Sequence, residues 1–384
     1  MKILIISSYT IPDFAGGGRN AWNFGSYLTR TGKSSLILTL NRNLKLKRNE
    51  IKNGTRIRRL PYFNANLILK SISFLFLIIP LTVFYILRSQ YIYIVGGNVI
   101  GYQFFILIGS LLGKKVIFRS SLHGMDDLKK LAKKGRMPRF VQGRILNRIH
   151  SYISINPQFT ESLSESGLKI RSFIESSQGV DIDVFKPLGM DRKCALRKEY
   201  SIPSDAFVVL SVGHIIQRKG YDEMVEFLSQ TDLELIYIIA GEISYSKGHF
   251  MFGYAEEMER IINRAKAILG SKLILLGAVE NTSEIYNLAD VFLLGSHQEG
   301  TPNSLLEAMS CGLPVLSRDL RGISDYLVFP EKTGYLFKDR DSFSEGLQHL
   351  YSSSETRVQL AKNARNTILE DHSFETFFKR IFVE

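Results

Sequence analysis

The sequence predicts an α/β protein with two domains, each built around a parallel β-sheet. Two observations support this class. The chain has 384 residues, which is enough for two hydrophobic cores because single cores stop growing at roughly 250 residues. Short apolar runs also alternate with stretches of helical length in both halves of the chain, and this order is typical of βαβ units.

The predicted strands fall into two groups. In the first half the apolar runs begin at residues 2, 35, 91 and 115 and read "KILIIS", "SLILTL", "YIYIVGG" and "KVIFRSS". In the second half they begin at residues 206, 233, 272, 290 and 313 and read "AFVVLSVG", "LELIYIIAG", "KLILLGA", "DVFLLGS" and "LPVLSR". Between the groups, Gly, Pro and Asp interrupt both periodicities over residues 176–189, so we place the linker there. We expect an N-terminal domain over residues 1–178 and a C-terminal domain over residues 190–366.

Charge is distributed unevenly between the two halves. The formal net charge is +12, but residues 1–180 hold 27 Lys+Arg and 7 Asp+Glu, which gives +20 and leaves −8 for residues 181–384. A basic surface of this kind suits nucleic acid, anionic lipid or a phosphorylated substrate. The sequence contains no recognition helix or base-stacking motif, so we do not expect nucleic acid as a partner.

The cysteine content and the N-terminal residues indicate in which cellular compartment the protein works. Only Cys194 and Cys311 are present, and no motif pairs them, so we expect neither a disulfide framework nor a cysteine zinc site. The chain begins directly with a strand-like run and lacks the basic region and cleavage site of a secretion signal. These features favour the cytoplasm.

An apolar stretch before the third strand is one candidate for membrane contact. Residues 67–87 read "LILKSISFLFLIIPLTVFYIL". Lys70 leaves an uncharged run of 17 residues, shorter than the roughly 20 that a bilayer core requires, and Pro80 interrupts it. A buried or half-buried helix fits best, with a membrane-docking surface or a true span as alternatives.

A basic stretch over residues 126–150 is a second candidate. Its cations alternate with Leu, Met, Phe and Ile; they are Lys129, Lys130, Lys133, Lys134, Arg136, Arg139, Arg144 and Arg148. One interpretation is a solvated helical face. The other is an interfacial patch, since each basic group near an anionic leaflet contributes on the order of 1 kcal/mol.

Two carboxylates accompany the start of a predicted helix in the second half. Residues 297–315 read "HQEGTPNSLLEAMSCGLPV" and follow a buried strand, and Gly312 and Pro314 end the helix. A helix N-terminus at the carboxyl end of a parallel sheet offers N–H groups and partial positive charge to a phosphate or hydroxyl-rich ligand. Glu299 would stand beside that ligand, and Glu307 would accept hydrogen bonds from a diol such as a ribose.

The same stretch resembles a motif of a known enzyme family. Its pattern E-G-x(6)-E-A-M-x-x-G-x-P-V is similar to the E-x(7)-E motif of the retaining glycosyltransferases of family 4, also called glycosyl transferases group 1. The resemblance implies the GT-B architecture, in which two Rossmann-like domains face a central cleft. The last stretch, "SFETFFKRIFVE", is amphipathic and follows the last predicted strand, so we expect a terminal helix over residues 367–384 that crosses back to pack near the N-terminal domain.

The resemblance implies roles for the residues of this motif. Glu299 would contact the donor sugar and Glu307 the ribose of the nucleotide. The backbone of the intervening loop would bind sugar or phosphate; its residues are Thr301, Pro302, Asn303 and Ser304.

Three other segments resemble the same family. In "SVGHIIQRKGYD" the resemblance implies that Arg218 and Lys219 hold the nucleotide diphosphate, and adjacent cations would stabilise the charge that develops on a departing diphosphate. In "SSLHGMDD" it implies that His123 contacts the donor sugar across the cleft. In "IPDFAGGGRNAW", Gly16 and Gly17 would let the backbone approach the donor phosphates before the first helix.

Two other ligand interpretations are weaker. Gly16, Gly18 and Ala21 satisfy G-x-G-x-x-A, but the pattern does not follow its strand directly and the ribose-binding acid is missing, so a dinucleotide site is not expected. The D-x-D triplets at residues 181–183 and 339–341 suggest a metal-dependent transferase. The first triplet, however, resembles the interdomain segment of family 4, and no clustered His/Cys spacing appears elsewhere, so we expect no metal and no cofactor.

Together these observations predict a retaining glycosyltransferase that moves a sugar from a nucleotide diphosphate sugar to a hydroxyl acceptor. The basic N-terminal half favours a lipid-linked saccharide acceptor in bacterial surface polysaccharide synthesis. The chain would then work as a peripheral protein at the inner face of the cell membrane. A nucleotide-sugar epimerase of similar shape and a non-catalytic nucleotide-sugar-binding protein are the alternatives.

Overall fold

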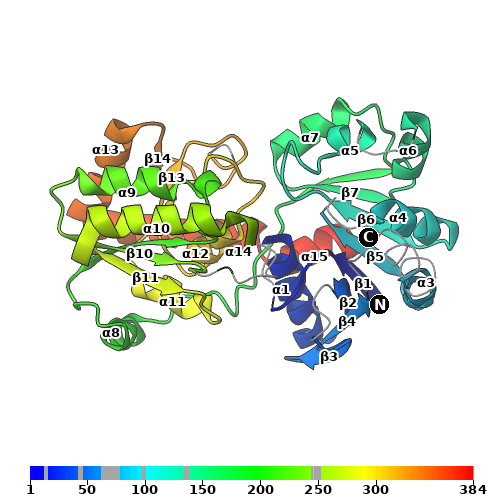
Figure 1. The fold of residues 1–384 in the computed structure, drawn as a ribbon, viewed down its shortest axis with the longest axis horizontal. Helices are drawn as coiled ribbons and strands as arrows, with labels where there is room; N and C mark the ends of the chain where they lie inside the picture. Colours follow the sequence, from blue (N-terminus) through cyan, green and yellow to red (C-terminus); the bar gives the residue numbers. More distant parts are fainter. Residues whose placement is uncertain are drawn as a thin grey trace. The chain divides into compact units, whose positions relative to one another are not determined.

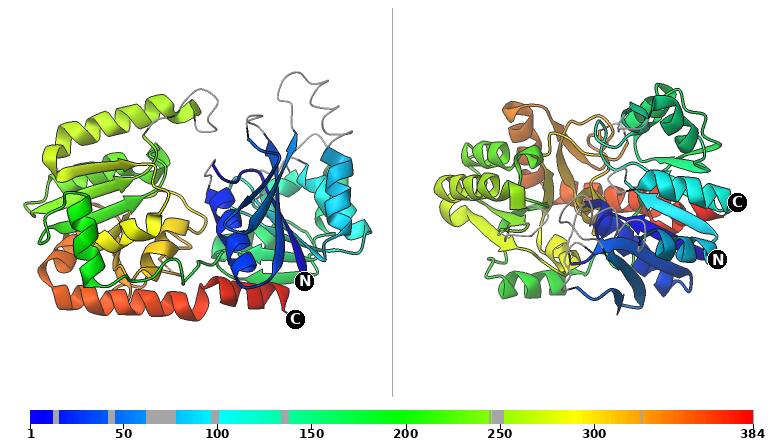
Figure 2. Two further views of the ribbon diagram at one scale, coloured as in Figure 1. Left: turned by 90° about the horizontal axis from the view of Figure 1, so that it is seen from below. Right: turned by 45° about the vertical axis from the view of Figure 1, so that its right-hand side comes forward.

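The chain folds into two compact units. The computed structural model describes residues 1–12, 16–41, 46–61, 78–96, 101–133, 138–243, 245, 252–324 and 326–383. Unit 1 consists of Met1–Gln178 with Phe378–Glu384, and unit 2 is Gly179–Phe377. Each unit has its own sheet with helices on its faces (Figures 1 and 2), and this confirms the predicted α/β class.

The sheet of unit 1 has the strand order β3-β4-β2-β1-β5-β6-β7-β8. All neighbours pair in parallel except β3 and β4. The strands are β1 (Lys2–Ser7), β2 (Ser34–Asn41), β3 (Asn49–Lys52), β4 (Thr55–Pro61), β5 (Tyr91–Val95), β6 (Lys115–Arg119), β7 (Ser151–Ser154) and β8 (Ser172–Glu175). The four strands predicted for this half are present as β1, β2, β5 and β6, whereas β3, β4, β7 and β8 were not predicted.

The helices of unit 1 connect these strands. They are α1 (Gly16–Arg30), α3 (Ile79–Leu87), α4 (Tyr102–Leu111), α5 (Leu128–Lys133), α6 (Arg139–Leu146) and α7 (Pro157–Ser164). Gly16 and Gly17 form the first turn of α1 rather than a loop before it, so that part of the sequence prediction was wrong. The last helix of the chain is α15 (Phe374–Phe382), and its Phe382 packs in unit 1 with its ring centroid 5.2 Å from that of Tyr91.

The sheet of unit 2 has the order β11-β10-β9-β12-β13-β14 and is parallel throughout. Its strands are β9 (Phe207–Val212), β10 (Leu235–Ala240), β11 (Leu273–Gly277), β12 (Val291–Leu294), β13 (Val315–Arg318) and β14 (Gly334–Phe337). The five strands predicted for this half are all present, and β14 is additional.

Two apolar cores lie on the two faces of this sheet, because alternate strand residues point to opposite sides. In β9, Val208 and Leu210 belong to one core, while Phe207 and Val209 belong to the other. The first core is covered by α8 (Met190–Glu199), α11 (Thr282–Leu288), α12 (Asn303–Ser310) and α14 (Ser354–Asp371). The second is covered by α9 (Tyr221–Ser229), α10 (Ala255–Leu269) and α13 (Arg340–Ser352). The described part of the unit also contains short 3-10 helices: η2 (Gln217–Lys219), η3 (Phe252–Tyr254) and η4 (Gly270–Lys272).

Each sheet contains a point at which the strand order reverses. In unit 2 the chain runs outward from β9 to β10 and β11, and then returns to place β12 on the other side of β9. In unit 1 the corresponding neighbours are β1 and β5. The loops that leave the carboxyl ends of two such strands diverge, and ligands of open α/β sheets bind in the crevice that results. This topology makes the loops after β9 and β12 the first place to look for a site.

The local structure bears on two of the sequence candidates, the apolar stretch over residues 67–87 and the second D-x-D triplet. Of residues 67–87, positions 67–77 lie outside the described residues, and the remainder contains α3. In the described part of the chain, we find no helix that combines the length and the apolar character needed to cross a bilayer. The second D-x-D triplet serves the fold, because Asp339 caps α13 by accepting a hydrogen bond from the Ser342 backbone N–H at 3.0 Å.

Candidate functional site

Three charged side chains meet where the strand order of unit 2 reverses. Arg218 and Lys219 lie on η2, in the loop after β9, and Glu299 lies in the loop after β12. The Lys219 Nζ is 2.5 Å from Oε1 of Glu299, and the Arg218 Nη1 is 3.6 Å from its Oε2. The backbone joins the same loops, since the His297 N–H donates to the Arg218 carbonyl at 2.8 Å. The structure therefore brings together three of the predicted site residues.

The Glu299 carboxylate is buried and ionised within this cluster. Its side chain is 8% exposed, and the Ser296 hydroxyl donates to it at 2.7 Å. Burial raises the pKa of Glu299, but the charges of Lys219 and Arg218 outweigh it and hold that pKa below its ordinary value. With two cations and one carboxylate, the cluster keeps one positive charge in excess.

The lowered pKa of Glu299 predicts how this cluster affects stability as the pH changes. A carboxylate whose pKa falls on folding stabilises the native state above its unfolded pKa and loses that contribution as the pH falls through the folded value. We therefore expect the wild type to exceed Glu299→Gln in free energy of unfolding near neutral pH, and the difference to shrink below about pH 4.5. Urea unfolding at a series of pH values measures it, with Glu280→Gln as an exposed control. A difference that does not change with pH would contradict the ionised, paired state.

The helix that follows Glu299 begins at Asn303, and Glu307 lies in its second turn. No side chain caps its N-terminus, where Pro302 is the N-cap residue, so the partial positive charge of the helix end faces this loop. Thr301 and Ser304 are buried at 6% and 9% exposure. Glu307 is 4% exposed and accepts a hydrogen bond from the Tyr286 hydroxyl at 2.8 Å. Its carboxylate thus has a different environment from Glu299, and its role towards a ribose stays a prediction.

Two further charged residues, Arg318 and Glu223, support the loops of this cluster and were not predicted from the sequence. Arg318, the last residue of β13, is 9% exposed and donates to the Gly295 carbonyl at 3.1 Å. It also pairs with Glu223 in the first turn of α9. Arg318 thus ties the start of the Glu299 loop to the helix that follows Lys219. One feature of the sequence could have pointed to Arg318: it is the last residue of β13, the strand that lies next to β12 in the sheet.

A cavity of about 460 Å³ adjoins Arg218 within unit 2. Its lining residues are Ile216, Gln217, Arg218, Tyr254, Glu257 and His297. Tyr254 is 44% exposed, and the His297 side chain is 49% exposed. Aromatic rings and a guanidinium around an open space suit a planar, polar ligand group next to an anion.

In unit 1, His123 lies in the loop after β6, at the carboxyl edge of that sheet. Its ring centroid is 5.9 Å from that of Phe159 in an edge-to-face arrangement. The loop is held by Asp126, whose carboxylate accepts from the Ser121 N–H at 2.9 Å and the Leu122 N–H at 2.8 Å. Gly17 lies near the same edge, because a Cβ on it would be 3.6 Å from the Ser121 hydroxyl. The structure thus places His123 and Gly17 on one rim of unit 1.

Replacement of Asp126 should destabilise the loop that carries His123. We expect Asp126→Ala to lower the free energy of unfolding by about 2 kcal/mol, because hydrogen bonds to a buried charged acceptor are lost and two amides are left unsatisfied. Hydrogen exchange at the Ser121 and Leu122 amides should accelerate. Asp126→Asn keeps an acceptor oxygen and should lose less than the alanine variant. Equal losses in both variants would show that the hydrogen bonds do not hold the loop.

The expectation that no metal is required stays a prediction. Within the described residues, no group of three or more His, Cys, Asp or Glu side chains has the arrangement to hold a metal ion. In the first D-x-D triplet, Asp181 is 5% exposed and accepts from the Asp183 backbone N–H at 3.2 Å. That triplet shapes the local backbone.

Known sequences resemble the second half of the chain. Residues 193–367 match the family model described as glycosyl transferases group 1. The alpha-galactosylglucosyldiacylglycerol synthase of Streptococcus pneumoniae is 27% identical over 233 residues, which are 61% of this chain and 60% of the relative. The Escherichia coli UDP-Gal:alpha-D-GlcNAc-diphosphoundecaprenol alpha-1,3-galactosyltransferase is 27% identical over 198 residues, which are 50% of this chain and 48% of that protein. The chain therefore matches about half to three fifths of these relatives' lengths.

Solved structures resemble the whole chain in fold. Anabaena HepE, solved in complex with UDP and glucose, superposes with a TM-score of 0.75 at 16% identity over 99% of this chain and 98% of that chain. The sucrose-phosphate synthase of Thermosynechococcus elongatus gives a TM-score of 0.75 at 18% identity over 97% and 95% of the two chains. These likenesses establish the GT-B fold. Within that fold, residues 193–367 are similar to the glycosyl transferases group 1 family.

Proposed function

We propose that this chain is a retaining glycosyltransferase that moves a sugar from a nucleoside diphosphate sugar to a hydroxyl group of an acceptor. The observation that carries the proposal is the cluster of Arg218, Lys219 and Glu299 at the strand reversal of unit 2. A diphosphate gains negative charge as its bond to the sugar breaks, and fixed cations in a partly buried site stabilise that charge. The excess positive charge of the cluster fits this task.

The individual roles form part of the proposal. Arg218 and Lys219 hold the diphosphate, and the 301–304 loop with the N-terminus of α12 adds its partial positive charge. Glu307 binds the ribose, and Glu299 binds the sugar. In unit 1, His123 acts on the sugar, while Gly16 and Gly17 leave room for phosphate. When the ligand enters, Lys219 exchanges part of its contact with Glu299 for phosphate oxygens.

No separate base is needed for the retaining reaction that we propose. The departing phosphate takes the acceptor proton on the face from which it leaves, so the new bond forms with the original anomeric configuration. The protein then contributes orientation and charge stabilisation. We also propose that no metal takes part, so turnover should be unchanged after treatment with EDTA.

A lipid-linked saccharide is the acceptor that we propose. The named relatives support it, since one is a diacylglycerol glycolipid synthase and another acts on a diphosphoundecaprenol-linked sugar. The charge of +20 on residues 1–180 is consistent with an anionic acceptor or its membrane. We place the reaction at the cytoplasmic face of a bacterial membrane, in surface polysaccharide synthesis.

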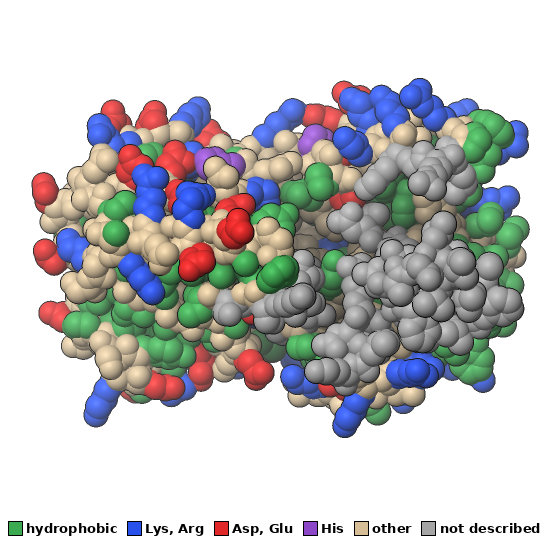
Figure 3. Space-filling model, viewed as in Figure 1, with side chains coloured by type: hydrophobic (Ala, Val, Ile, Leu, Met, Phe, Trp, Pro, Cys, Tyr) green, Lys and Arg blue, Asp and Glu red, His purple; other side chains and the backbone are tan. Residues whose placement is uncertain are grey.

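Exposed cations on α5 and α6 support contact with an anionic membrane. The basic side chains that the structure describes on these helices are all exposed: Lys129, Lys130, Lys133, Arg139 and Arg144. Arg148, just after α6, is exposed as well. Phe140 is 65% exposed beside them, and Figure 3 shows Lys and Arg side chains along the edge of unit 1 that bears these helices. Lys129 pairs with Glu165 at 2.6 Å, and Lys134 lies outside the described residues.

Flotation with anionic liposomes tests the membrane contact. The informative variant is Lys130→Glu/Lys133→Glu/Arg144→Glu, which leaves the ion pair of Lys129 intact. We expect this variant to lose flotation, because each basic group contributes on the order of 1 kcal/mol at an anionic surface. Unchanged flotation would remove these helices from the proposal.

Donor binding and product analysis test the enzymatic proposal. A nucleotide sugar that binds the folded state should raise the melting temperature, so a panel of donors identifies the base and sugar. The bound donor is then incubated with and without a lipid-linked acceptor, and NMR of the product reports the anomeric configuration. A changed nucleotide sugar formed without acceptor would indicate an epimerase. Binding without any turnover would indicate a non-catalytic binding protein.

A further inference from the structure

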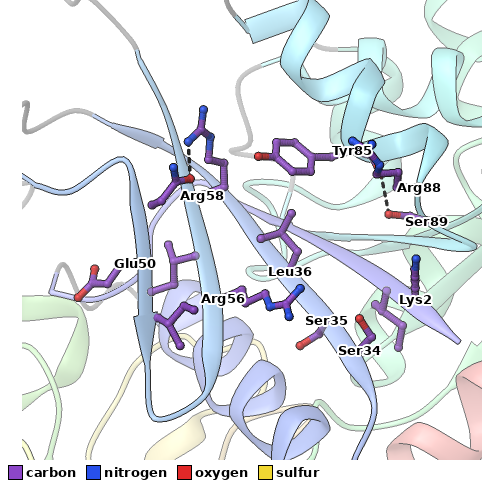
Figure 4. Close-up of a pocket in the computed structure, with 14 residues that line it drawn as sticks. Lys2, Ser34, Ser35, Leu36, Glu50, Arg56, Arg58, Tyr85, Arg88 and Ser89 are labelled. Atoms are coloured by element: carbon purple, nitrogen blue, oxygen red, sulfur yellow. Dashed lines mark hydrogen bonds between the residues drawn. The ribbon is translucent and has the colours of Figure 1, made fainter.

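A second cavity lies in unit 1, away from the carboxyl edge that carries His123. It has a volume of about 490 Å³ and is shown in Figure 4. Its walls come from the beginnings of β1 and β2, from β3 and β4, and from the end of α3. Lys2 and Ser34 are the first residues of their strands, so the cavity lies at the amino edge of the sheet. This edge is opposite to the carboxyl edge of the same sheet, which carries His123.

Four cations line this cavity against one carboxylate. The cations are Lys2, Arg56, Arg58 and Arg88, and the carboxylate is Glu50. Glu50 is already paired, with its Oε2 2.7 Å from Nη1 of the buried Arg59. Arg58 donates to the Asn49 side-chain oxygen, which is neutral. Within the described residues, none of the four cations forms an ion pair with Asp or Glu.

The surrounding sequence offers almost no acid to balance these cations. Residues 1–100 contain 14 Lys+Arg and only two acidic residues, Asp13 and Glu50. Positive charges close together raise the electrostatic potential of a concave surface, and a bound anion lowers that potential. The positive charge of the cavity is therefore a property of this whole part of the chain.

The remaining lining suits a phosphate that carries an organic group. Hydroxyl donors are supplied by Ser34 and Tyr85, and apolar surface by Ile3 and Leu36. The hydroxyls of Ser35 and Ser89 also line the cavity, but they donate to the Gly25 and Tyr85 carbonyls. Figure 4 shows Arg56 extending from β4 towards Ser34 and Ser35. The Arg88 guanidinium stacks on Phe84 at 3.6 Å from the ring centroid, which orients its fork of donors.

We propose that this cavity binds a phosphate-bearing ligand, which Arg56, Arg58 and Arg88 hold through charge-assisted hydrogen bonds. The ligand is either a free phosphorylated molecule or the phosphate headgroup of a lipid. The residues of this cavity belong to unit 1, whereas Arg218, Lys219 and Glu299 of the proposed donor site belong to unit 2. Binding at this cavity does not depend on the chain being a glycosyltransferase.

The test compares matched double variants. Arg56→Gln/Arg88→Gln removes two exposed guanidiniums of the cavity, and Lys169→Gln/Arg171→Gln removes two exposed cations of unit 1 that do not line it. Calorimetry measures binding of inorganic pyrophosphate, and sedimentation measures binding to phosphatidylcholine vesicles with and without phosphatidylglycerol. We expect the cavity variant to lose about 10-fold or more in affinity and the control to lose little. Arg218→Gln/Lys219→Gln, measured in parallel, separates any pyrophosphate bound at the donor site.

Each outcome has one interpretation. Loss of pyrophosphate binding in the cavity variant supports the proposal and indicates a soluble ligand. Loss of binding to phosphatidylglycerol vesicles alone supports it and indicates a lipid headgroup. If both probes bind the cavity variant as tightly as they bind the control variant, or if neither binds the wild type, the proposal is overturned. Melting curves of both double variants verify that they are folded.

Discussion

Gly220→Ala is expected to destabilise unit 2 by about 4 kcal/mol. Gly220 has φ of +71°, and a Cβ added to it would lie 2.1 Å from the Gly295 carbonyl oxygen. The left-handed backbone conformation costs roughly 1 kcal/mol for a residue with a Cβ, and a clash with backbone that cannot move aside costs about 3 kcal/mol more. The close approach of these two glycines is what lets the loops of Lys219 and Glu299 meet. Urea unfolding measures the loss.

Two other glycines provide matched controls for Gly220→Ala. Gly167 has the same φ of +71° and would have no atom within 4 Å of its Cβ, so Gly167→Ala measures the cost of a positive φ without a clash. Gly253 has neither a left-handed φ nor a neighbour within 4 Å, so Gly253→Ala should be nearly neutral. If Gly220→Ala cost no more than Gly167→Ala, the clash with Gly295 would not be a real constraint.

Lys219→Met is expected to lower kcat/KM for sugar transfer by about 10²–10³-fold. Under the proposed function, Lys219 neutralises the diphosphate as it leaves, so its loss acts in the transition state. The change also leaves the buried Glu299 with Arg218 as its nearest cation at 3.6 Å, which should reduce stability as well. Steady-state kinetics with the donor found by thermal shift measures the first effect, and urea unfolding the second.

A double variant separates chemistry from folding at this position. Lys219→Met/Glu299→Gln removes the stranded carboxylate and should regain stability, but it should not regain turnover. Lys272→Met removes a half-exposed lysine at the amino end of β11 and should change neither quantity. Recovery of turnover in the double variant would mean that Lys219 acts only by pairing with Glu299, and the proposed role in charge stabilisation would fail.

Strands with an ordinary apolar pattern could be predicted, whereas a charged strand could not. The nine predicted strands are present because each is an apolar run bounded by turn residues. β4 was missed because it reads "TRIRRLP", with arginine at three of seven positions. Arg59 is 2% exposed within that strand and donates to the Ile11 carbonyl at 2.7 Å. Its burial depends on partners far along the chain, which a local pattern does not contain.

The candidate site also contains residues that could be predicted from the sequence and residues that could not. The Glu299 motif and the Arg218–Lys219 pair were found from the sequence because they resemble a known family, and the structure brings them together. Arg318 and Glu223 were not found, since neither stands in a recognised motif. The placement of Gly16 and Gly17 before the first helix was wrong: α1 begins at Gly16, although glycine is a poor helix former in isolation.

Local apolar periodicity thus specifies the α/β class and most strands, because burying an apolar face requires only near neighbours in the sequence. The pairing of Lys219 with Glu299, eighty positions apart, depends on the chain returning to place β12 beside β9. This strand order is determined by the packing of two cores against one sheet. The strand order in turn determines which charged residues become neighbours. An ion pair between distant segments is therefore determined by the three-dimensional fold and is not encoded in any short stretch of residues.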